Sequence, residues 1–561
     1  MVLSSRLRWA CSTTVRACAV FAVYALLARV VSWAAFQPGW SENHEALAMF
    51  ERVEGFRRAF TAGDWFPVWS PFPNNGHGAA MPLLYHRAFN FVAGLLAWKF
   101  GTYRAVKTAI ALLIAFGAFG AHRAARTLGA RPFLCFAAGA TFATAPYVLT
   151  EWFVRGAVAE LTAMMILPWL VGATIRFSRG ESVGVRMGVL SAVLFHAHAM
   201  IAFFALPLPV FAGVASIAWP LRGDRRAAIL RVLSAGLRFS LPFLLLTGPA
   251  LLGIYLVRRQ FRTDILEDLQ AVQQYVPFTR YLLDPQELGG AVQLFSVEIG
   301  PAIVLSLVVL AFASAVTRTR VLGPAIAFLA GALAFYLCLL HPWSSLFFRV
   351  VPGAMLLQFP WRLLVFVVPL SVLLVCGLSQ ALFTARPHAR PAVALALSLA
   401  VAFELLRTIA GQKVTYGHFA KADVLRVIDS LNGPNYTEYL PLSVPAAPPA
   451  RSLVSLRGCR LAAGSPPLPE LAHFDRLELV VEATHDCAVD IGQFCSSFVE
   501  VTSSRGVPRC SRATTYQVQI PDGEVARVVI RRRSLWSVIT SELRSRKRPF
   551  RGEPRLIATR L

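Results

Sequence analysis

Charged side chains are scarce in this sequence. Only 15% of its 561 residues are Asp, Glu, Lys or Arg, whereas 56% are hydrophobic. Soluble domains carry about a quarter charged residues, and disordered chains carry few apolar ones, so the composition excludes a soluble enzyme, a disordered scaffold and a fibrous protein. Long apolar segments recur from Val15 to about Ala410. The net charge of +25 is therefore better explained by membrane topology or anionic lipid than by nucleic-acid binding.

Metal-binding patterns are also missing. No C-x-x-C pair occurs, and His196-Ala197-His198 lacks the i, i+4 spacing with which a helix presents two histidines to a metal, so we assign no metal site. Four of the nine cysteines gather in the polar C-terminal part: Cys459, Cys487, Cys495 and Cys510. They predict two disulfides if that part is exported, with the pairing left open and a zinc site as the weaker alternative.

The apolar segments are long enough to predict a polytopic membrane protein, since a spanning helix needs about 20 mostly apolar residues. We expect eleven spans, at 17–36, 106–121, 132–149, 158–175, 184–197, 199–219, 239–257, 299–316, 321–340, 362–384 and 391–409. The region 184–219 is compatible with two short spans or one long helix. The segment 88–100 is apolar but shorter, which favours an interfacial helix.

Arginines are distributed unevenly between alternate connections. If the N-terminus is cytoplasmic, the connections on that side hold 18 Arg and two acidic residues, whereas the opposite loop 258–298 holds four Arg and six acidic residues. Cytoplasmic loops carry the excess of Lys and Arg. The pattern predicts a cytoplasmic N-terminus and an exported C-terminal domain.

We expect two domains. Residues 1–410 would form an all-α membrane bundle with a long first outer loop at 37–105 and another at 258–298. Residues 411–561 would form a periplasmic or extracellular β-rich domain, because apolar and polar residues partly alternate at 476–482, 514–520 and 524–530. A sandwich or jelly roll is the expected form.

The first outer loop begins Glu42-Asn43-His44-Glu45, directly after the first span. A partly desolvated carboxylate there can act as a general base toward a hydroxyl, which makes Glu42 and Glu45 candidate catalytic residues and His44 a candidate binding residue. A polar helix start is the alternative, since acidic residues favour helix N-termini. Farther along, His77 between two glycines and Tyr85 are candidates for contact with a sugar.

Three ionisable residues stand at predicted helix entrances. Arg155 and Glu160 enter the span at 158–175, and Arg362 enters the span at 362–384 after Gln358-Phe359-Pro360-Trp361. Charged groups within spans are costly and indicate function, and an Arg beside a helix N-terminus suits a lipid phosphate. The alternatives are an interfacial ion pair for Arg155 with Glu160 and a snorkelling interface anchor for Arg362.

Together these motifs resemble the GT-C class of membrane glycosyltransferases. More closely, the chain is similar to bacterial and archaeal membrane proteins labelled "6-pyruvoyl-tetrahydropterin synthase-related" and their YfhO-like relatives. The residues that carry the resemblance are Glu42–Glu45, Gly63–Pro71, Asn75–Gly78, Pro82–Tyr85, Arg155, Gly156, Glu160, His196, Gln358–Arg362 and Tyr436–Pro441.

The resemblance implies transfer of a sugar from a polyprenyl-phosphate carrier to a glycan, lipid or protein acceptor, by inversion, at the outer face of the bacterial cytoplasmic (inner) membrane. It also implies that Glu42 or Glu45 is the base. The E-N-H-E sequence departs from a D-x-D motif, which leaves the base assignment open and keeps a divalent metal as an alternative.

Two other functions compete with this one. A transporter or flippase for a lipid-linked glycan predicts charges deep within spans and internal repeats, whereas Glu404 is one of few such charges and no repeat is detected. A non-catalytic envelope-glycan assembly factor predicts that Glu42 and Glu45 are dispensable.

Overall fold

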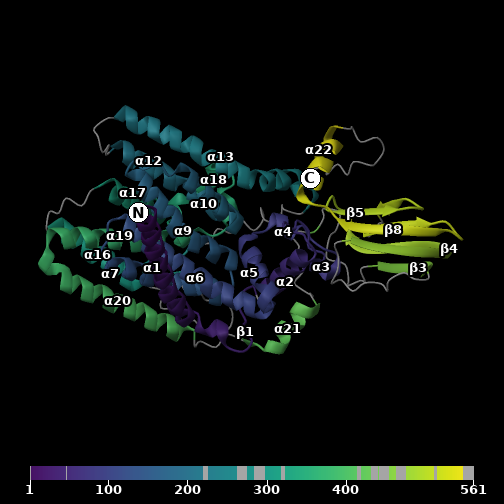
Figure 1. The fold of residues 1–561 in the computed structure, drawn as a ribbon, viewed down its shortest axis with the longest axis horizontal. Helices are drawn as coiled ribbons and strands as arrows, with labels where there is room; N and C mark the ends of the chain where they lie inside the picture. The colour runs from purple at the N-terminus through teal and green to yellow at the C-terminus, as the bar shows by residue number, and fades with distance from the viewer. Residues whose placement is uncertain are drawn as a thin grey trace. The chain divides into compact units, whose positions relative to one another are not determined.

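The computed structural model describes residues 2–45, 47–218, 225–261, 275–282, 297–316, 323–412, 418–430, 440, 454–462, 476–510 and 515–547. Side chains of residues 2–13, 259, 314–316 and 545–547 are not described. The chain divides into two compact units (Figure 1). One is helical and comprises 1–54, 86–247 and 266–430; the other comprises 55–85, 248–265 and 431–561.

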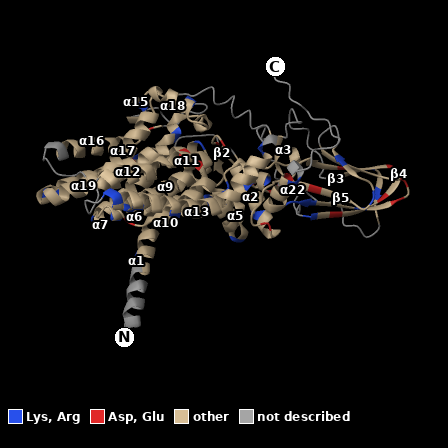
Figure 2. Cartoon of the chain, turned by 90° about the horizontal axis from the view of Figure 1, so that it is seen from above, with Lys and Arg blue, Asp and Glu red and all other residues tan. Residues whose placement is uncertain are grey.

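Seven helices are long and apolar enough to cross a membrane, among the described residues. They are α1 (Val2–Val31), α6 (Thr102–Thr127), α9 (Val158–Ser178), α11 with α12 (Ala199–Ala205, Pro207–Ala218), α13 (Arg225–Val257), η6 with α19 (Pro360–Leu363, Leu364–Ala385) and η7 with α20 (Pro387–Ala389, Arg390–Gly411). Figure 2 shows that most of the ribbon of α9, α12, α13 and α19 carries neither the Lys and Arg colour nor the Asp and Glu colour.

Two further spans are bent. The helix α7 (Pro132–Ala143) turns by 43° into α8 (Pro146–Leu149) and the π-helical η2 (Thr150–Val154), and α17 (Pro324–Leu339) turns by 84° into η4 (Pro342–Ser344) and α18 (Ser345–Val350). Both breaks precede a proline, whose ring cannot continue the preceding helix. The multi-span architecture is confirmed at seven to nine spans, whereas the expected eleven are not.

The difference in span number comes from short helices. The expected span 184–197 is α10 (Gly184–Ala197), and 299–316 contains α16 (Pro301–Val316); both are among the shorter apolar helices, as is α5 (Ala88–Phe100). The remaining elements of the helical unit are η1 (Trp33–Phe36), β1 (Trp40–Ser41), the start of α2 (Ala48–Thr61), α15 (Thr279–Leu282), η5 (Ala354–Leu357), β2 (His418–Phe419) and α21 (Lys421–Ser430).

The core of the helical unit is built on α6, α9 and α19. The apolar windows of α9 and α19 are each 94% buried, because neighbouring helices cover them on all sides. Small residues let α6 approach α9: a Cβ at Gly117 would lie 2.3 Å from Met165 Sδ, and one at Gly120 would lie 2.5 Å from Trp169 Nε1. Close packing of this kind is the usual way in which helices associate without water.

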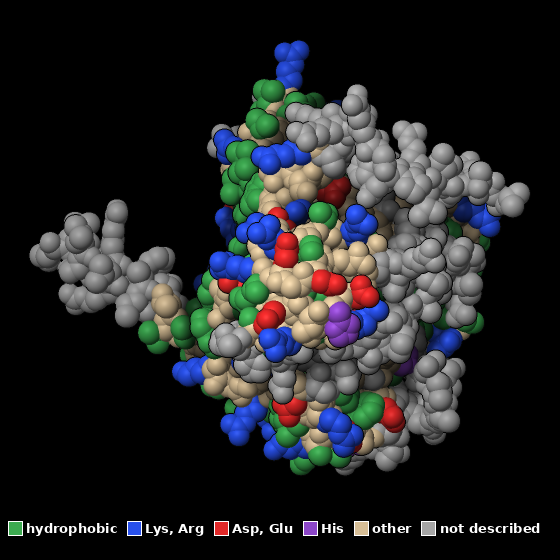
Figure 3. Space-filling model, turned by 90° about the vertical axis from the view of Figure 1, so that its right-hand side faces the viewer, with side chains coloured by type: hydrophobic (Ala, Val, Ile, Leu, Met, Phe, Trp, Pro, Cys, Tyr) green, Lys and Arg blue, Asp and Glu red, His purple; other side chains and the backbone are tan. Residues whose placement is uncertain are grey.

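The second unit contains one connected antiparallel sheet. Its strands are β3 (Val454–Leu461), β4 (Arg476–Phe494), β5 (Val499–Ser503), β6 (Pro508–Cys510), β7 (Thr515–Ile520) and β8 (Val525–Arg532). The order is β5-β8-β4-β7-β6, with β3 also paired to β4. The β-rich C-terminal domain is confirmed, and β7 and β8 fall where alternation predicts them. Figure 3 turns the right-hand side of Figure 1 toward the viewer and shows Lys, Arg, Asp and Glu interspersed on that face.

The sandwich or jelly roll stays a prediction. The described strands are hydrogen-bonded into one sheet because the 19-residue β4 serves both halves. Residues 476–482 of β4 pair with β8, and residues 487–494 pair with β7. Between them Asp486 adopts a φ of 42°, beside the register shift that β3 makes at Gly458. A bulge of this kind bends a strand sharply.

Part of the first loop belongs to the core of this second unit. Trp69 Nε1 donates to Gln493 Oε1 at 2.9 Å, and Gln493 Nε2 donates to the carbonyl of Gly76 at 2.7 Å. The buried His77 ring stacks on Phe494 and hydrogen-bonds the Gly492 carbonyl. The unit also contains α3 (Pro73–Gly76), α4 (Met81–Leu84), η3 (Arg258–Gln260) and α22 (Leu535–Lys547).

The four C-terminal cysteines form two disulfides, Cys459–Cys487 and Cys495–Cys510. We predict that the double variant Cys495→Ser/Cys510→Ser loses about 3 kcal/mol of unfolding free energy, because the bridge closes a loop of 15 residues in the unfolded chain. Denaturation of the full-length protein would measure the loss, and peptide mass spectrometry would verify the pairing. Cys18→Ser, at an exposed free cysteine, is the control. Equal stability of the double variant and this control would contradict the prediction.

Candidate functional site

A buried charged cluster lies where the bent span α7–α8–η2 meets α9. The last turn of this span is π-helical, with Arg155 N donating to Thr150 O, and Gly156 then reverses the chain at a φ of 66°. Single π turns recur at functional sites because they shift side chains out of helical register. The turn places Glu151 and Arg155 next to Glu160 in the first turn of α9.

Arg155 is held between two carboxylates. Its Nη1 pairs with Glu151 Oε1 and lies 3.0 Å from Glu160 Oε2, and all three side chains are at least 92% buried. Tyr147 donates its hydroxyl to Glu160 Oε1 at 3.2 Å. The second oxygen of Glu151 has no hydrogen-bond partner among the described residues. The two acids therefore fix Arg155, and the ion pair expected for Arg155 with Glu160 is present.

Arg362 approaches the same cluster from η6. Its Nε lies 3.6 Å from Glu160 Oε2, and its side chain remains 18% exposed. This Nε makes no hydrogen bond with any described residue. Arg155 lies over the ring of the preceding Trp361, 4.5 Å from the ring centroid, which ties the two arginines to one aromatic face. Of the two guanidiniums, Arg362 retains more capacity to bind an incoming anion.

Two stacked imidazoles adjoin the cluster. The rings of His86 and His198 lie 4.0 Å apart at an interplanar angle of 21°, and each accepts a backbone N–H at the start of α11 through Nδ1. Burial is the main reason that the pKa of His86 lies well below its usual value, and the neighbouring His198 and Arg362 lower this pKa further. A neutral ring that accepts at Nδ1 carries its proton on Nε2, where it is a donor.

The start of the first loop reaches this cluster. Partial burial lowers the pKa of His44, and the positive charge of Arg155 lowers it further, whereas Glu45 raises it. Glu45 Oε2 accepts from Arg52 Nη2 at 2.5 Å. Glu42 is exposed and makes no hydrogen bond or ion pair with any described residue. The two acidic residues thus differ, since Glu45 is engaged and Glu42 is not.

Gly156 is needed where the loop meets the π turn. A Cβ there would lie 2.6 Å from Oδ1 of the buried Asn43, and the positive φ also disfavours other residues. Neither side-chain atom of Asn43 has a hydrogen-bond partner in the described structure. A buried amide without partners is costly, so this amide is a candidate contact for a bound molecule.

A second charged group lies near the first. Arg407 of α20 pairs with the buried Glu298 and lies 3.4 Å from Glu404. A Cβ on Gly300 would contact both Glu404 Oε1 and Pro146 Cδ at 3.2 Å. Since Tyr147 follows Pro146 and donates to Glu160, the two charged groups are joined through α8.

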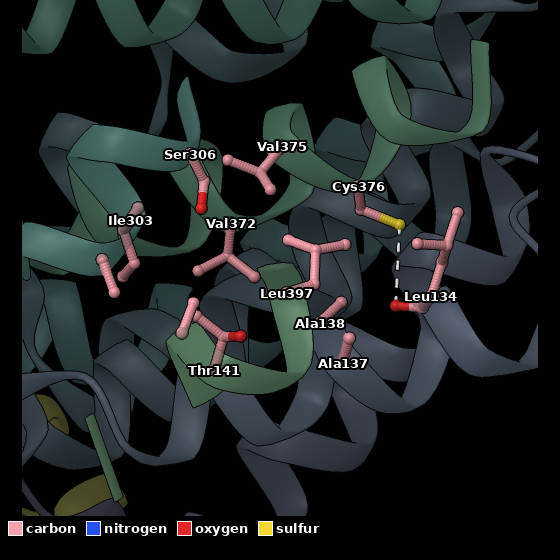
Figure 4. Close-up of a pocket in the computed structure, with 12 residues that line it drawn as sticks. Leu134, Ala137, Ala138, Thr141, Ile303, Ser306, Val372, Val375, Cys376 and Leu397 are labelled. Atoms are coloured by element: carbon pink, nitrogen blue, oxygen red, sulfur yellow. Dashed lines mark hydrogen bonds between the residues drawn. The ribbon is translucent and has the colours of Figure 1, made fainter. Parts of the chain in front are cut away.

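An apolar groove runs between α16 and α20. It has a volume of about 550 Å³ and ends at Phe403, whose ring lies 5.7 Å from the Arg407 guanidinium carbon. A smaller pocket shares four of its lining residues and extends toward α7 and α19 (Figure 4). There Ile303, Leu397 and Val372 surround the space, and Cys376 lies near the Leu134 carbonyl.

The structure brings together five of the residues that the sequence singles out: His44, Glu45, Arg155, Glu160 and Arg362. Glu42 precedes them in the chain. His77 and Tyr85 belong to the other unit, where His77 is engaged by β4. The motif Tyr436–Pro441 lies outside the described residues except for Leu440. Among the described residues, no group of three or more His, Cys, Asp or Glu has a metal-binding arrangement.

Sequence reasoning missed Arg52, His86, Tyr147 and Glu151 as members of the cluster. The i, i+4 spacing of Glu151 and Arg155 was an available signal, since such pairs share a helix face. His86 and His198 carried none, because 112 residues separate them and only the fold stacks their rings.

No protein-family model matches the sequence, and no curated protein sequence matches it. Solved structures resemble it in part. Arabinofuranosyltransferase AftD from mycobacteria is 19% identical, with 71% of this chain and 27% of that one covered and a TM-score of 0.42, and the apo oligosaccharyltransferase of Archaeoglobus fulgidus is 13% identical, with coverages of 76% and 61% and a TM-score of 0.46. ArnT from Cupriavidus metallidurans bound to undecaprenyl phosphate is 14% identical, with coverages of 74% and 69% and a TM-score of 0.39. The chain spans about a quarter of AftD and three fifths of the oligosaccharyltransferase. Each TM-score is below 0.5, so these likenesses do not establish a shared fold.

We predict that Arg155→Ala costs about 3–5 kcal/mol of stability, because it leaves Glu151 and Glu160 buried without their cation. Arg176→Ala is the matched control, since its pair with Glu181 is 37% and 44% exposed and exposed pairs contribute about 0–1 kcal/mol. Denaturation of both variants in detergent micelles would compare them. Equal losses would show that the buried cluster does not stabilise the bundle.

Proposed function

We propose that the chain is a membrane glycosyltransferase that moves a sugar from a polyprenyl-phosphate donor at the outer face of a bacterial inner membrane. The observation that carries the proposal is the convergence of Arg155, Glu160 and Arg362 with His44 and Glu45 of the first loop. Such a reaction needs a base for the acceptor hydroxyl and positive charge where the departing phosphate develops negative charge. Both kinds of group stand at this site.

Arg362 is the proposed phosphate ligand, and Arg155 is a positioning residue. Arg155 is already bound to two carboxylates, whereas the Arg362 Nε makes no hydrogen bond with the residues that the structure describes, and the side chain is partly exposed. A guanidinium can hold phosphate through paired N–H donors. The Nε2 proton of the neighbouring His198 adds a donor for the same anion.

The groove between α16 and α20 is the proposed place for the isoprenoid tail. Its lining is apolar, with Ser306 as the polar exception among the lining residues, and its volume of about 550 Å³ suits a hydrocarbon segment. It ends beside Arg407, and Pro146 and Tyr147 connect that group to Glu160. A lipid in the groove would therefore present its head toward the charged cluster.

Glu42 is the stronger candidate for the base. An inverting transfer needs a carboxylate oxygen that accepts the proton of the acceptor hydroxyl while that hydroxyl attacks the anomeric carbon and the carrier phosphate leaves. Arg52 already occupies an oxygen of Glu45, whereas no described residue occupies Glu42. Dependence on a divalent metal, the cytoplasmic N-terminus and the narrower pterin-synthase-related resemblance stay predictions.

We predict that Glu42→Gln lowers transfer about 100-fold or more, because it removes the base and keeps the shape. Glu45→Gln should act more weakly, through Arg52. Cells that lack the gene would be complemented with each variant, and envelope glycans and polyprenyl-phosphate sugars would be quantified by mass spectrometry. Glu181→Gln, at an exposed carboxylate, is the control. Wild-type glycans in the Glu42→Gln, Glu45→Gln and doubly substituted strains would favour the assembly-factor alternative.

We also predict that Arg362→Ala weakens binding of undecaprenyl phosphate by about tenfold or more, since a hydrogen bond to a charged group contributes about 1.5–3 kcal/mol. Native mass spectrometry of the full-length protein with added lipid would measure occupancy. Arg349→Ala, at an exposed arginine of α18, controls for loss of charge. Unchanged occupancy in Arg362→Ala would place the phosphate elsewhere.

A further inference from the structure

A group of arginines lies at the opposite end of α9 from the candidate site. Glu160 stands in the first turn of α9 and Arg176 in the last turn, so about 24 Å separates the two ends. The arginines that gather there come from four helices: Arg123 and Arg126 of α6, Arg176 of α9, Arg186 of α10 and Arg238 of α13. Among the described residues, Glu181 is the only acidic residue that pairs with any of them. Positive charge is thus concentrated without the carboxylates that balance it around Arg155.

Direct contacts hold these parts of the four helices together. Arg179, which follows α9, donates through Nη1 to the Thr127 carbonyl at the end of α6. Arg238 Nη1 donates to Ser182 Oγ at 2.6 Å, just before α10 begins, and a Cβ at Gly184 would lie 2.9 Å from Arg238 Cβ. The arginines of α6, α9, α10 and α13 therefore share one region of the bundle.

Three of the guanidinium groups are reachable and unoccupied. Arg123, Arg126 and Arg186 are exposed, and their side chains make no hydrogen bond or ion pair with any residue that the structure describes. Arg186 lies in α10, outside the seven to nine spans. Partial burial lowers its pKa, and the like charges of Arg176 and Arg123 lower it further. Cations that disfavour one another in this way are stabilised by an anion placed among them.

Membrane topology alone does not account for this convergence. The excess of Lys and Arg in cytoplasmic connections requires positive residues on one side of the membrane, but it does not bring guanidinium groups of separate helices within electrostatic reach of one another. Repulsion between like charges costs free energy, especially where water is partly excluded. A bound anion would offset that cost.

Two exposed apolar rows begin beside these arginines. They are Val185, Val189 and Val193 on α10, next to Arg186, and Leu237, Leu241 and Leu245 on α13, next to Arg238. Residues four apart share a helix face. The two helices run in the same direction, because Gly184 packs against Ala235 and Gly188 packs against Phe239. Both rows therefore lead away from the arginines in one direction, as the two acyl chains of a phospholipid would.

We propose that Arg123, Arg126 and Arg186 bind the phosphate headgroup of an anionic phospholipid whose acyl chains lie along α10 and α13. Guanidinium groups hold phosphate through paired N–H donors, and basic sites between membrane helices suit anionic headgroups. A soluble anion would use the arginines and leave the apolar rows unused. The inference does not rest on the proposed transferase activity, since Arg362 pairs with Glu160 at the other end of α9.

Native mass spectrometry of the full-length protein in detergent micelles tests this site. The probes are phosphatidylglycerol, phosphatidylcholine with the same acyl chains, and glycerol 3-phosphate as a soluble headgroup. We expect phosphatidylglycerol to be retained more strongly than phosphatidylcholine and to resist displacement by equimolar glycerol 3-phosphate. Each basic residue near an anionic lipid contributes about 1 kcal/mol, so Arg186→Gln should weaken binding about fivefold and Arg123→Gln/Arg186→Gln about 25-fold. Arg104→Gln, at an exposed arginine in the first turn of α6, should bind as wild type does.

Equal retention of the two phospholipids by the wild type would overturn the site, as would equal retention of phosphatidylglycerol by the wild type and the double variant, or an equal loss in Arg104→Gln. Displacement by glycerol 3-phosphate would overturn the assignment to a phospholipid. Undecaprenyl phosphate separates this test from that of the carrier site, because its binding should persist in Arg123→Gln/Arg186→Gln and fall in Arg362→Ala. A double variant that loses both lipids equally would overturn the separate phospholipid site.

Discussion

The contact between Arg155 and its two carboxylates is the constraint on which the rest of the candidate site depends. Burying three ionised groups is tolerated only when each is paired and hydrogen-bonded. That requirement holds the π turn against α9, and the position of the turn determines where Gly156, Trp361 and Arg362 lie. Gly156 must follow it, because only glycine leaves room for Asn43, and Trp361 must cover the guanidinium, which brings Arg362 within reach of Glu160. The loop, the bent span and η6 are thus positioned by one electrostatic arrangement.

The two arginines of the site carry the same charge but differ in their contacts. Arg155 is bound by two carboxylates, whereas Arg362 makes one longer ion pair, with Glu160, and donates to the Leu357 carbonyl. The neighbouring histidines contribute in their neutral form, because burial and mutual proximity disfavour a second positive charge beside Arg362.

The sequence predicted what depends on local pattern. Apolar runs gave most of the long helices, alternation located β7 and β8, and costly charges at helix entrances pointed to Arg155, Glu160 and Arg362. Its eleven spans are not confirmed, because hydropathy does not separate a 14-residue helix such as α10 from a full crossing. It missed the stacking of His86 on His198 and the engagement of His77 by β4, because those contacts join segments far apart in the chain. The irregularity at Asp486, between the two halves of β4, also has no apolar signature.

The composition of the second unit has a consequence for biosynthesis. Residues 55–85 contribute Trp69 and His77 to a core whose remaining strands are encoded nearly 400 residues later. The ribosome therefore delivers the first piece of this core long before its partners exist, and the piece must wait, unpacked and rich in aromatic surface, until the last strands emerge. Chains with such delayed partners are exposed to misassembly during synthesis. A premature stop before Gly492 would thus deprive Trp69 and His77 of Gln493 and Phe494 as well as removing the tail.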